Sequence, residues 1–167
     1  RRQRQMCIRD RIIPALEGTR PLLVEIQSLV APTPYVPPRR TSDSIDIKKI
    51  QLLLAVLEKR VHLNMGTCDV YVKVAGGIKI DDPAVDLALC CAMASSFRNQ
   101  SIKPQTIIFG EVGLSGEVRS VSQPDIRVRE AIRMGFTNII LPAKNLERLE
   151  HFASNVQIHG VRYLSEA

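Results

Sequence analysis

The segment that most constrains the fold is residues 81–99, DDPAVDLALCCAMASSFRN. It begins with acidic residues, and Pro83 stands where the first turn of a helix tolerates proline. The alanines and leucines that follow would fall on nearly every side of a helix, and we expect this helix over about 83–98. A helix that is apolar on most sides must be buried on most of its circumference. The chain therefore needs other elements to surround this helix.

The first half of the chain supplies strands and a second helix. The run 12–32 predicts a pair of strands, broken at Gly18 and Thr19. Residues 32–43, PTPYVPPRRTSD, hold four of the ten prolines and predict an exposed loop. Asp43 or Ser44 can cap an amphipathic helix that runs to about His62. Alternating valines then predict a strand over 69–75.

The second half continues the alternation of strands and helices. After Pro104 the pattern predicts a strand, a glycine-rich turn and a short returning strand. We further expect a helix over about 124–134 with Gly135 as its C-terminal cap, a strand at 137–143, a helix at 145–152 capped by Asn145, and a last strand at 156–161. The predicted class is α/β (α+β), a mixed sheet with helices packed on it.

Length and composition place the chain among ordinary globular domains. Its 167 residues fit one domain. Its apolar runs fall far short of the roughly 18 residues that cross a bilayer, so we expect no membrane association. Aromatic residues make up 4% with no Trp, which argues against a base-stacking platform. Cys7, Cys68, Cys90 and Cys91 form no C-x-x-C pair, so a reducing, cytoplasmic location is expected.

Most of the positive charge lies in a short N-terminal arm. The net charge is +6, but residues 1–11 hold five Arg and one Asp, a net of +4. The other 156 residues carry 18 basic and 16 acidic side chains, a net of +2. The arm is either a DNA-seeking tail or a non-native addition to the fold.

Motifs for nucleotide or metal chemistry are missing from the sequence. It has no G-x-x-x-x-G-K-[ST] loop, so we expect neither ATP hydrolysis nor any cofactor in this chain. His62, His151 and His159 lack metal-ligand spacing. Asp81, Asp82 and Asp86 could form a metal cluster, but acidic residues at a helix N-terminus are explained by the helix dipole. We therefore expect no metal site.

Four stretches carry a family resemblance: 16–30 (LEGTRPLLVEIQSLV), 75–96 (AGGIKIDDPAVDLALCCAMASS), 109–121 (FGEVGLSGEVRSV) and 134–145 (MGFTNIILPAKN). Together they resemble the C-terminal Lon-protease-like domain of the bacterial RadA (Sms) family of DNA repair proteins. The resemblance runs from about Ile12 to the end of the chain and implies a fold of ribosomal-S5-like type. Residues 1–11 do not match, so the predicted organisation is an unmatched basic arm at 1–11 and a Lon-like domain at 12–167.

The resemblance also defines where a peptidase centre would stand. Lon peptidases use a Ser–Lys dyad, in which the lysine takes the proton of the attacking serine. The segment D-G-P-S-A-G around that serine aligns with residues 81–86, which puts Ala84 at the nucleophile position, and the lysine position falls on Asp125. Ser95 and Ser96 have no obvious base. The resemblance therefore implies a domain without catalytic residues, and the alternative of a Ser–Lys peptidase is disfavoured.

What remains is a role in binding and assembly. RadA-like proteins are ATP-driven machines of DNA repair and recombination, and their ATP and zinc sites belong to upstream domains. For this part the resemblance implies ring assembly, with a homohexamer expected, and contact with DNA, but no small-molecule substrate. The candidate DNA-binding residues are Arg39, Arg40, Arg119, Arg127 and Arg129. For each of them the alternative is a solvated charge or an ion pair between subunits. The proline-rich loop and residues 115–123 are the candidate subunit interfaces.

Overall fold

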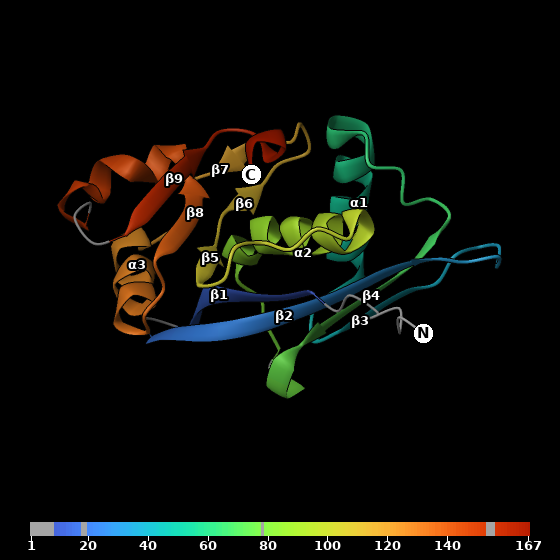
Figure 1. Cartoon of the computed structure of the whole chain (residues 1–167), viewed down its shortest axis with the longest axis horizontal. Helices are drawn as coiled ribbons and strands as arrows, with labels where there is room; N and C mark the ends of the chain where they lie inside the picture. The colour runs from blue at the N-terminus through green and yellow to red at the C-terminus, as the bar shows by residue number, and fades with distance from the viewer. Residues whose placement is uncertain (1–8, 18–19, 78, 153–155) are drawn as a thin grey trace, which may run out of the picture.

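The computed structural model describes residues 9–17, 20–77, 79–152 and 156–167, and it is built on one mixed sheet (Figure 1). The seven strands of this sheet lie in the order β3-β4-β2-β1-β5-β8-β9. Their bounds are β1 Arg9–Glu17, β2 Arg20–Pro32, β3 Arg40–Asp43, β4 Cys68–Val74, β5 Thr106–Ile108, β8 Asn138–Pro142 and β9 Gln157–Val161. A separate two-stranded hairpin joins β6 (Glu111–Val112) to β7 (Val118–Arg119). The predicted mixed sheet with packed helices is confirmed.

The sheet has two differently built halves. β1 pairs with β2, and β2 with β4, in antiparallel fashion, while β3 adds to β4 in parallel. On the other side, β1, β5, β8 and β9 are all parallel neighbours. Parallel neighbours need crossover connections, which here contain α3 (Pro124–Arg133) and the short 3₁₀ turns η3 (Ala143–Arg148) and η4 (Glu150–Phe152). The basic arm falls largely on residues 1–8, which lie outside the described residues, while residues 9–11 belong to β1.

The core forms around α2 (Asp86–Arg98), as its sequence predicts. Figure 1 shows α2 lying over the sheet beside α1 (Ile47–Val61). Leu87 lies on the side of α2 opposite to the face that Leu89 and Met93 share, and all three side chains are completely buried. A second cluster, which includes Phe109 and Val128, packs α3 against the parallel strands. Among the described residues, no helix is long and apolar enough to cross a membrane.

Two predictions around the first helix are wrong. Residues 40–43 do not belong to an exposed loop but form the edge strand β3, because the prolines end at Pro38 and the backbone beyond it is free to pair with β4. Neither Asp43 nor Ser44 caps α1. Asp43 lies in β3, and the cap is Asp46, whose Oδ1 accepts a hydrogen bond from the Lys48 N–H at 3.0 Å.

The predicted helix at 145–152 is also wrong, since the 3₁₀ turns η3 and η4 occupy these positions. Asn145 does not cap a helix. It is buried inside η3, where Oδ1 accepts from the Val121 N–H at 3.0 Å and Nδ2 donates to the Val121 C=O at 3.2 Å. The Asn145 side chain therefore forms with the Val121 backbone the two hydrogen bonds that a neighbouring strand would form. By contrast, Gly135 ends α3 as predicted, with a φ of 89°.

Candidate functional site

Ala84, which the resemblance to Lon peptidases puts at the nucleophile position, lies in η2 (Pro83–Val85), a single 3₁₀ turn that leads into α2. Ala84 is 2% exposed and packs in the cluster that contains Phe109 and Val128. Its C=O accepts a hydrogen bond from the Gly110 N–H at 2.9 Å. The residue at this position is therefore a methyl group held inside the core, with no hydroxyl for attack.

A buried ion pair holds one side of this turn. Arg127 of α3 is 1% exposed and binds the Asp82 carboxylate through Nη1 at 2.7 Å and Nη2 at 3.3 Å. Its Nε donates to the Ser122 C=O at 2.9 Å. Asp82 in turn accepts the Ala84 N–H at 3.1 Å and so caps η2. The pair links the turn directly to α3.

This geometry overturns the prediction that Arg127 contacts DNA. On α3 the residue shares a face with Pro124, Val128 and Ala131, all of which are buried. Helical spacing of three and four residues turns that face toward the core. An arginine whose donors already bind a carboxylate and a carbonyl inside the protein is not available to a phosphate.

A second ion pair holds the other side of the turn. Asp86, the first residue of α2, binds Lys49 Nζ of α1 at 2.7 Å and accepts the Val112 N–H at 3.2 Å. Burial raises the pKa of the Asp86 carboxyl, and the hydrogen bond and charge of Lys49 offset this rise only in part. We call residues 82–86 with these two ion pairs the clamped segment.

The resemblance to Lon peptidases puts Asp125 at the lysine position, and a carboxylate is not the amine base of the dyad. Asp125 stands in the first turn of α3, two residues before Arg127. Ser95 and Ser96, the nearest serines along α2, are both buried. Ser95 Oγ donates to the Ala92 C=O at 3.2 Å, and Ser96 Oγ accepts the Val30 N–H at 3.0 Å. These contacts serve the packing of α2 and activate no nucleophile.

The geometry does not support the hypothesis that Asp81, Asp82 and Asp86 form a metal cluster. Asp82 and Asp86 bind Arg127 and Lys49. Within the described ranges no group of three or more His, Cys, Asp or Glu side chains could hold a metal ion. The carboxylates of this region stabilise the turn and the start of α2.

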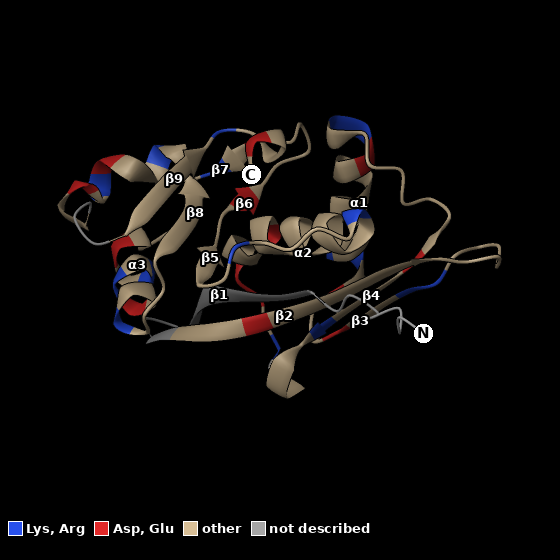
Figure 2. Ribbon diagram, in the orientation of Figure 1, with Lys and Arg blue, Asp and Glu red and all other residues tan. Residues whose placement is uncertain are grey.

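The remaining arginine candidates do not form one patch. Figure 2 shows the basic stretch that enters β3 and the basic residues of α3 at opposite ends of the molecule. Arg39 is exposed, and its guanidinium lies 4.7 Å from the centre of the Tyr35 ring. Arg40 is half-buried and donates to the carbonyls of Cys68 and Met65. Arg129 is exposed on α3.

Arg119 has charged neighbours that the sequence did not single out. It is exposed on β7, binds Glu117 at 3.0 Å, and lines a cleft of about 980 Å³. Lys144 of η3 and Arg162, which follows β9, line the same cleft together with Tyr163. These cations come from three distant segments that fold together, so no local pattern could have predicted their grouping.

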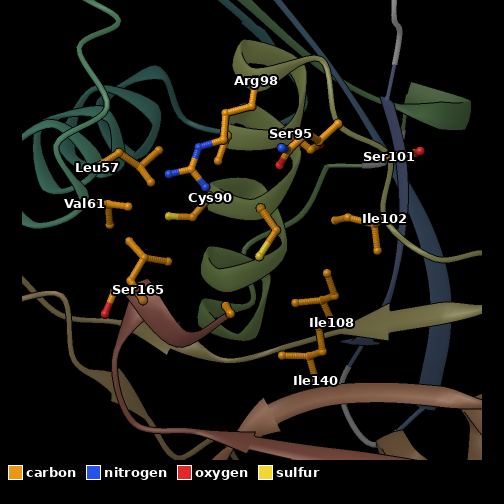
Figure 3. Close-up of a pocket in the computed structure, with 15 residues that line it drawn as sticks. Leu57, Val61, Cys90, Ser95, Arg98, Ser101, Ile102, Ile108, Ile140 and Ser165 are labelled. Carbon is orange, nitrogen blue, oxygen red and sulfur yellow. The ribbon is translucent and has the colours of Figure 1, made fainter.

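A smaller apolar pocket of about 200 Å³ lies between α1 and α2. Figure 3 shows Arg98 reaching over it toward Leu57 and Cys90. Burial raises the pKa of the Cys90 thiol well above its ordinary value, so the group stays protonated and is a poor nucleophile. The pocket offers apolar contacts and one cationic rim residue.

Comparisons with known proteins agree with this geometry. Residues 48–164 match the family model of the Lon protease (S16) C-terminal proteolytic domain. The chain is 48% identical over 156 residues to the DNA repair protein RadA of Bacillus subtilis, which is 93% of this chain and 34% of that protein. RadA of Synechocystis is 48% identical over 131 residues, which is 78% of this chain and 26% of that protein.

The chain spans about a third of the length of the Bacillus subtilis protein and about a quarter of the length of the Synechocystis protein. The family model covers more than half of the chain and includes both dyad positions. The chain belongs to the family of Lon protease C-terminal domains and is similar to the Lon-like domain of DNA repair proteins RadA.

Proposed function

We propose that this chain is the non-catalytic Lon-like domain of a RadA-type DNA repair and recombination protein, where it binds the DNA backbone and assembles a ring, expected to be a hexamer. The clamped segment is the main support for the non-catalytic part. It carries the buried Ala84 at the position that the resemblance assigns to the nucleophile. On either side of Ala84, Asp82 and Asp86 form ion pairs with Arg127 and Lys49. The cytoplasmic parent would hydrolyse ATP through another domain.

No cleavage of an unfolded protein substrate is expected from the purified chain. A methyl group at position 84 cannot attack a carbonyl, and the carboxylate of Asp125 is not the amine base of the dyad. We expect the Ala84→Ser, Asp125→Lys double variant to stay inactive as well, because donors for the oxyanion must also be in place. Cleavage by the unaltered chain that disappears in Ser95→Ala or Ser96→Ala would contradict the proposal.

Arg119, Lys144 and Arg162 line the cleft that we propose as the contact for DNA phosphates, and the other charged residues of its lining are Glu111, Glu117 and Glu147. With three phosphate contacts, the logarithm of the binding constant should fall with the logarithm of the salt concentration at a slope of about −3, since each contact contributes about −0.9 to the slope. Replacing all three residues by Ala should weaken binding and bring the slope toward zero. The matched control replaces three exposed lysines outside the cleft, Lys48, Lys59 and Lys103, by Ala and should keep most of the slope.

The DNA-binding measurement must distinguish binding by the folded domain from binding by the N-terminal arm. Deleting residues 1–8 removes three arginines and leaves β1 complete. The measurement is fluorescence anisotropy of a labelled duplex at several salt concentrations, with and without these residues. Binding that survives the deletion and depends on the cleft supports the proposal, whereas loss of all binding on deletion assigns the signal to the arm.

A further inference from the structure

One end of the molecule carries an exposed apolar tip with a positive charge. The loop between β2 and β3 exposes 58% of Tyr35 and 93% of Val36. Hydrogen bonds hold it at both ends: Thr33 N–H donates to the Thr67 C=O at 3.0 Å, and Arg39 N–H donates to Asp69 Oδ1 at 2.6 Å. We call Tyr35, Val36 and Arg39 the loop tip. These hydrogen bonds hold the backbone of the loop, which lowers the conformational entropy lost on binding compared with an unrestrained loop.

The other end carries a pocket of complementary character. This pocket, of about 390 Å³, lies between the 3₁₀ turns η3 and η4 and β9. Its apolar lining comes from Leu146, Leu149, Val156 and Ile158, and its acidic lining from Glu147 and Glu150. Within the part of the chain that the structure describes, neither glutamate forms an ion pair. We call this site the acidic pocket.

We propose that the loop tip of one copy of this chain inserts into the acidic pocket of the next copy. Tyr35 and Val36 would fill the apolar floor, and the Arg39 guanidinium would pair with Glu147 or Glu150. The inference rests on the proposed self-association and gives that association its two surfaces. Burying the exposed apolar side chain of Val36 stabilises the contact. The opposite charges of the loop tip and the acidic pocket set the orientation of the two copies.

The positions of the two surfaces determine what they can build. Figure 1 shows the loop tip, in light blue, and the acidic pocket region, in orange and red, at opposite ends of the molecule. Two different patches on one subunit make a head-to-tail contact, which leaves a free tip and a free pocket after every addition. Such a contact ends only when the last copy meets the first, as in a ring. The acidic lining of the pocket favours a positively charged protein segment, such as the loop tip, as its occupant.

The first experiment is a charge exchange followed by sedimentation velocity over a wide concentration range. Arg39→Glu alone and the double change Glu147→Lys, Glu150→Lys alone should each raise the dissociation constant by at least about tenfold, as for other close interfacial charge pairs. Combining all three changes in one chain should restore most of the affinity. Arg129→Glu and Glu58→Lys alter exposed charges elsewhere and should leave the constant unchanged.

The second experiment tests the head-to-tail geometry. Val36→Asp disables the tip and keeps the pocket, while Glu147→Lys, Glu150→Lys disables the pocket and keeps the tip. Mixed together, the two variants should form a dimer that does not grow, because one functional tip meets one functional pocket. Urea denaturation of each variant establishes that it is folded before mixing.

The outcomes separate the two proposals. An unaltered chain that remains monomeric at every concentration would overturn the proposed self-association, and this interface with it. An unaltered chain that associates, while the tip and pocket variants keep its dissociation constant, would overturn only the interface. Failure of the two variants to form the mixed dimer would also overturn the head-to-tail contact.

Discussion

Replacing Arg127 by Met is expected to lower the free energy of unfolding by about 3–5 kcal/mol, the usual cost of removing one partner of a buried ion pair. Arg127 is 1% exposed and the Asp82 side chain is 10% exposed, so water cannot replace the lost guanidinium. The Ser122 carbonyl loses its donor in the same change. Methionine fills part of the volume but offers no hydrogen bond to either group.

Urea denaturation at neutral pH measures this effect, and Arg129→Met is the matched control. Arg129 lies two residues along the same helix and is exposed, so its replacement should change stability by no more than about 0.5 kcal/mol. Adding Asp82→Leu to Arg127→Met should recover only part of the loss, since it removes the uncompensated charge but also removes the cap of η2. If the two methionine variants were equally stable, Arg127 would not be the buried anchor described above.

Replacing Lys49 by Met should cost about 2–3 kcal/mol at neutral pH, somewhat less than the usual cost for a buried pair, because the Lys49 side chain is 31% exposed. Among the residues that the structure describes, the change leaves the buried Asp86 carboxylate with the Val112 N–H as its one hydrogen-bond partner. Lys48→Met, at an exposed neighbouring position, is the control and should have little effect.

The dependence on pH identifies the cause of this loss. The pKa of Asp86 is raised in the folded protein, so between its unfolded value and its folded value the folded state binds more protons. The free energy of unfolding therefore falls as the pH rises through this window. Removing Lys49 raises the folded pKa of Asp86 further, so the deficit of the variant should shrink as the pH is lowered. A deficit that stays constant between neutral and acidic pH would instead indicate lost packing of the lysine stem.

Local patterns in the sequence were sufficient for most secondary structure. The Ala- and Leu-rich run 83–98 predicts a helix buried on most sides, and α2 has this character. Alternating valines predict the strand that the structure shows as β4. Both features depend on neighbours three or four residues away in a helix, or two in a strand, so they can be read from the chain itself.

The predictions that failed depend on contacts with distant residues. Asn145 has the chemistry of a helix cap, yet its side chain pairs with the backbone of Val121, a residue 24 positions away. Residues 40–43 become a strand only because β4 lies beside them. Arg127 has the chemistry of a phosphate ligand, but the fold places Asp82 against it.

The sequence by itself determined the Lon-like fold, and it determined that positions 84 and 125 carry Ala and Asp, which are neither a hydroxyl nucleophile nor an amine base. Only the tertiary structure decided which charges pair with one another inside the protein and which gather at the surface. Two ion pairs join Asp82 to Arg127 and Asp86 to Lys49, while three exposed cations, Arg119, Lys144 and Arg162, line one cleft. The physical reason is that an ionic interaction depends on distance in space and on burial, and neither quantity is set by separation along the chain.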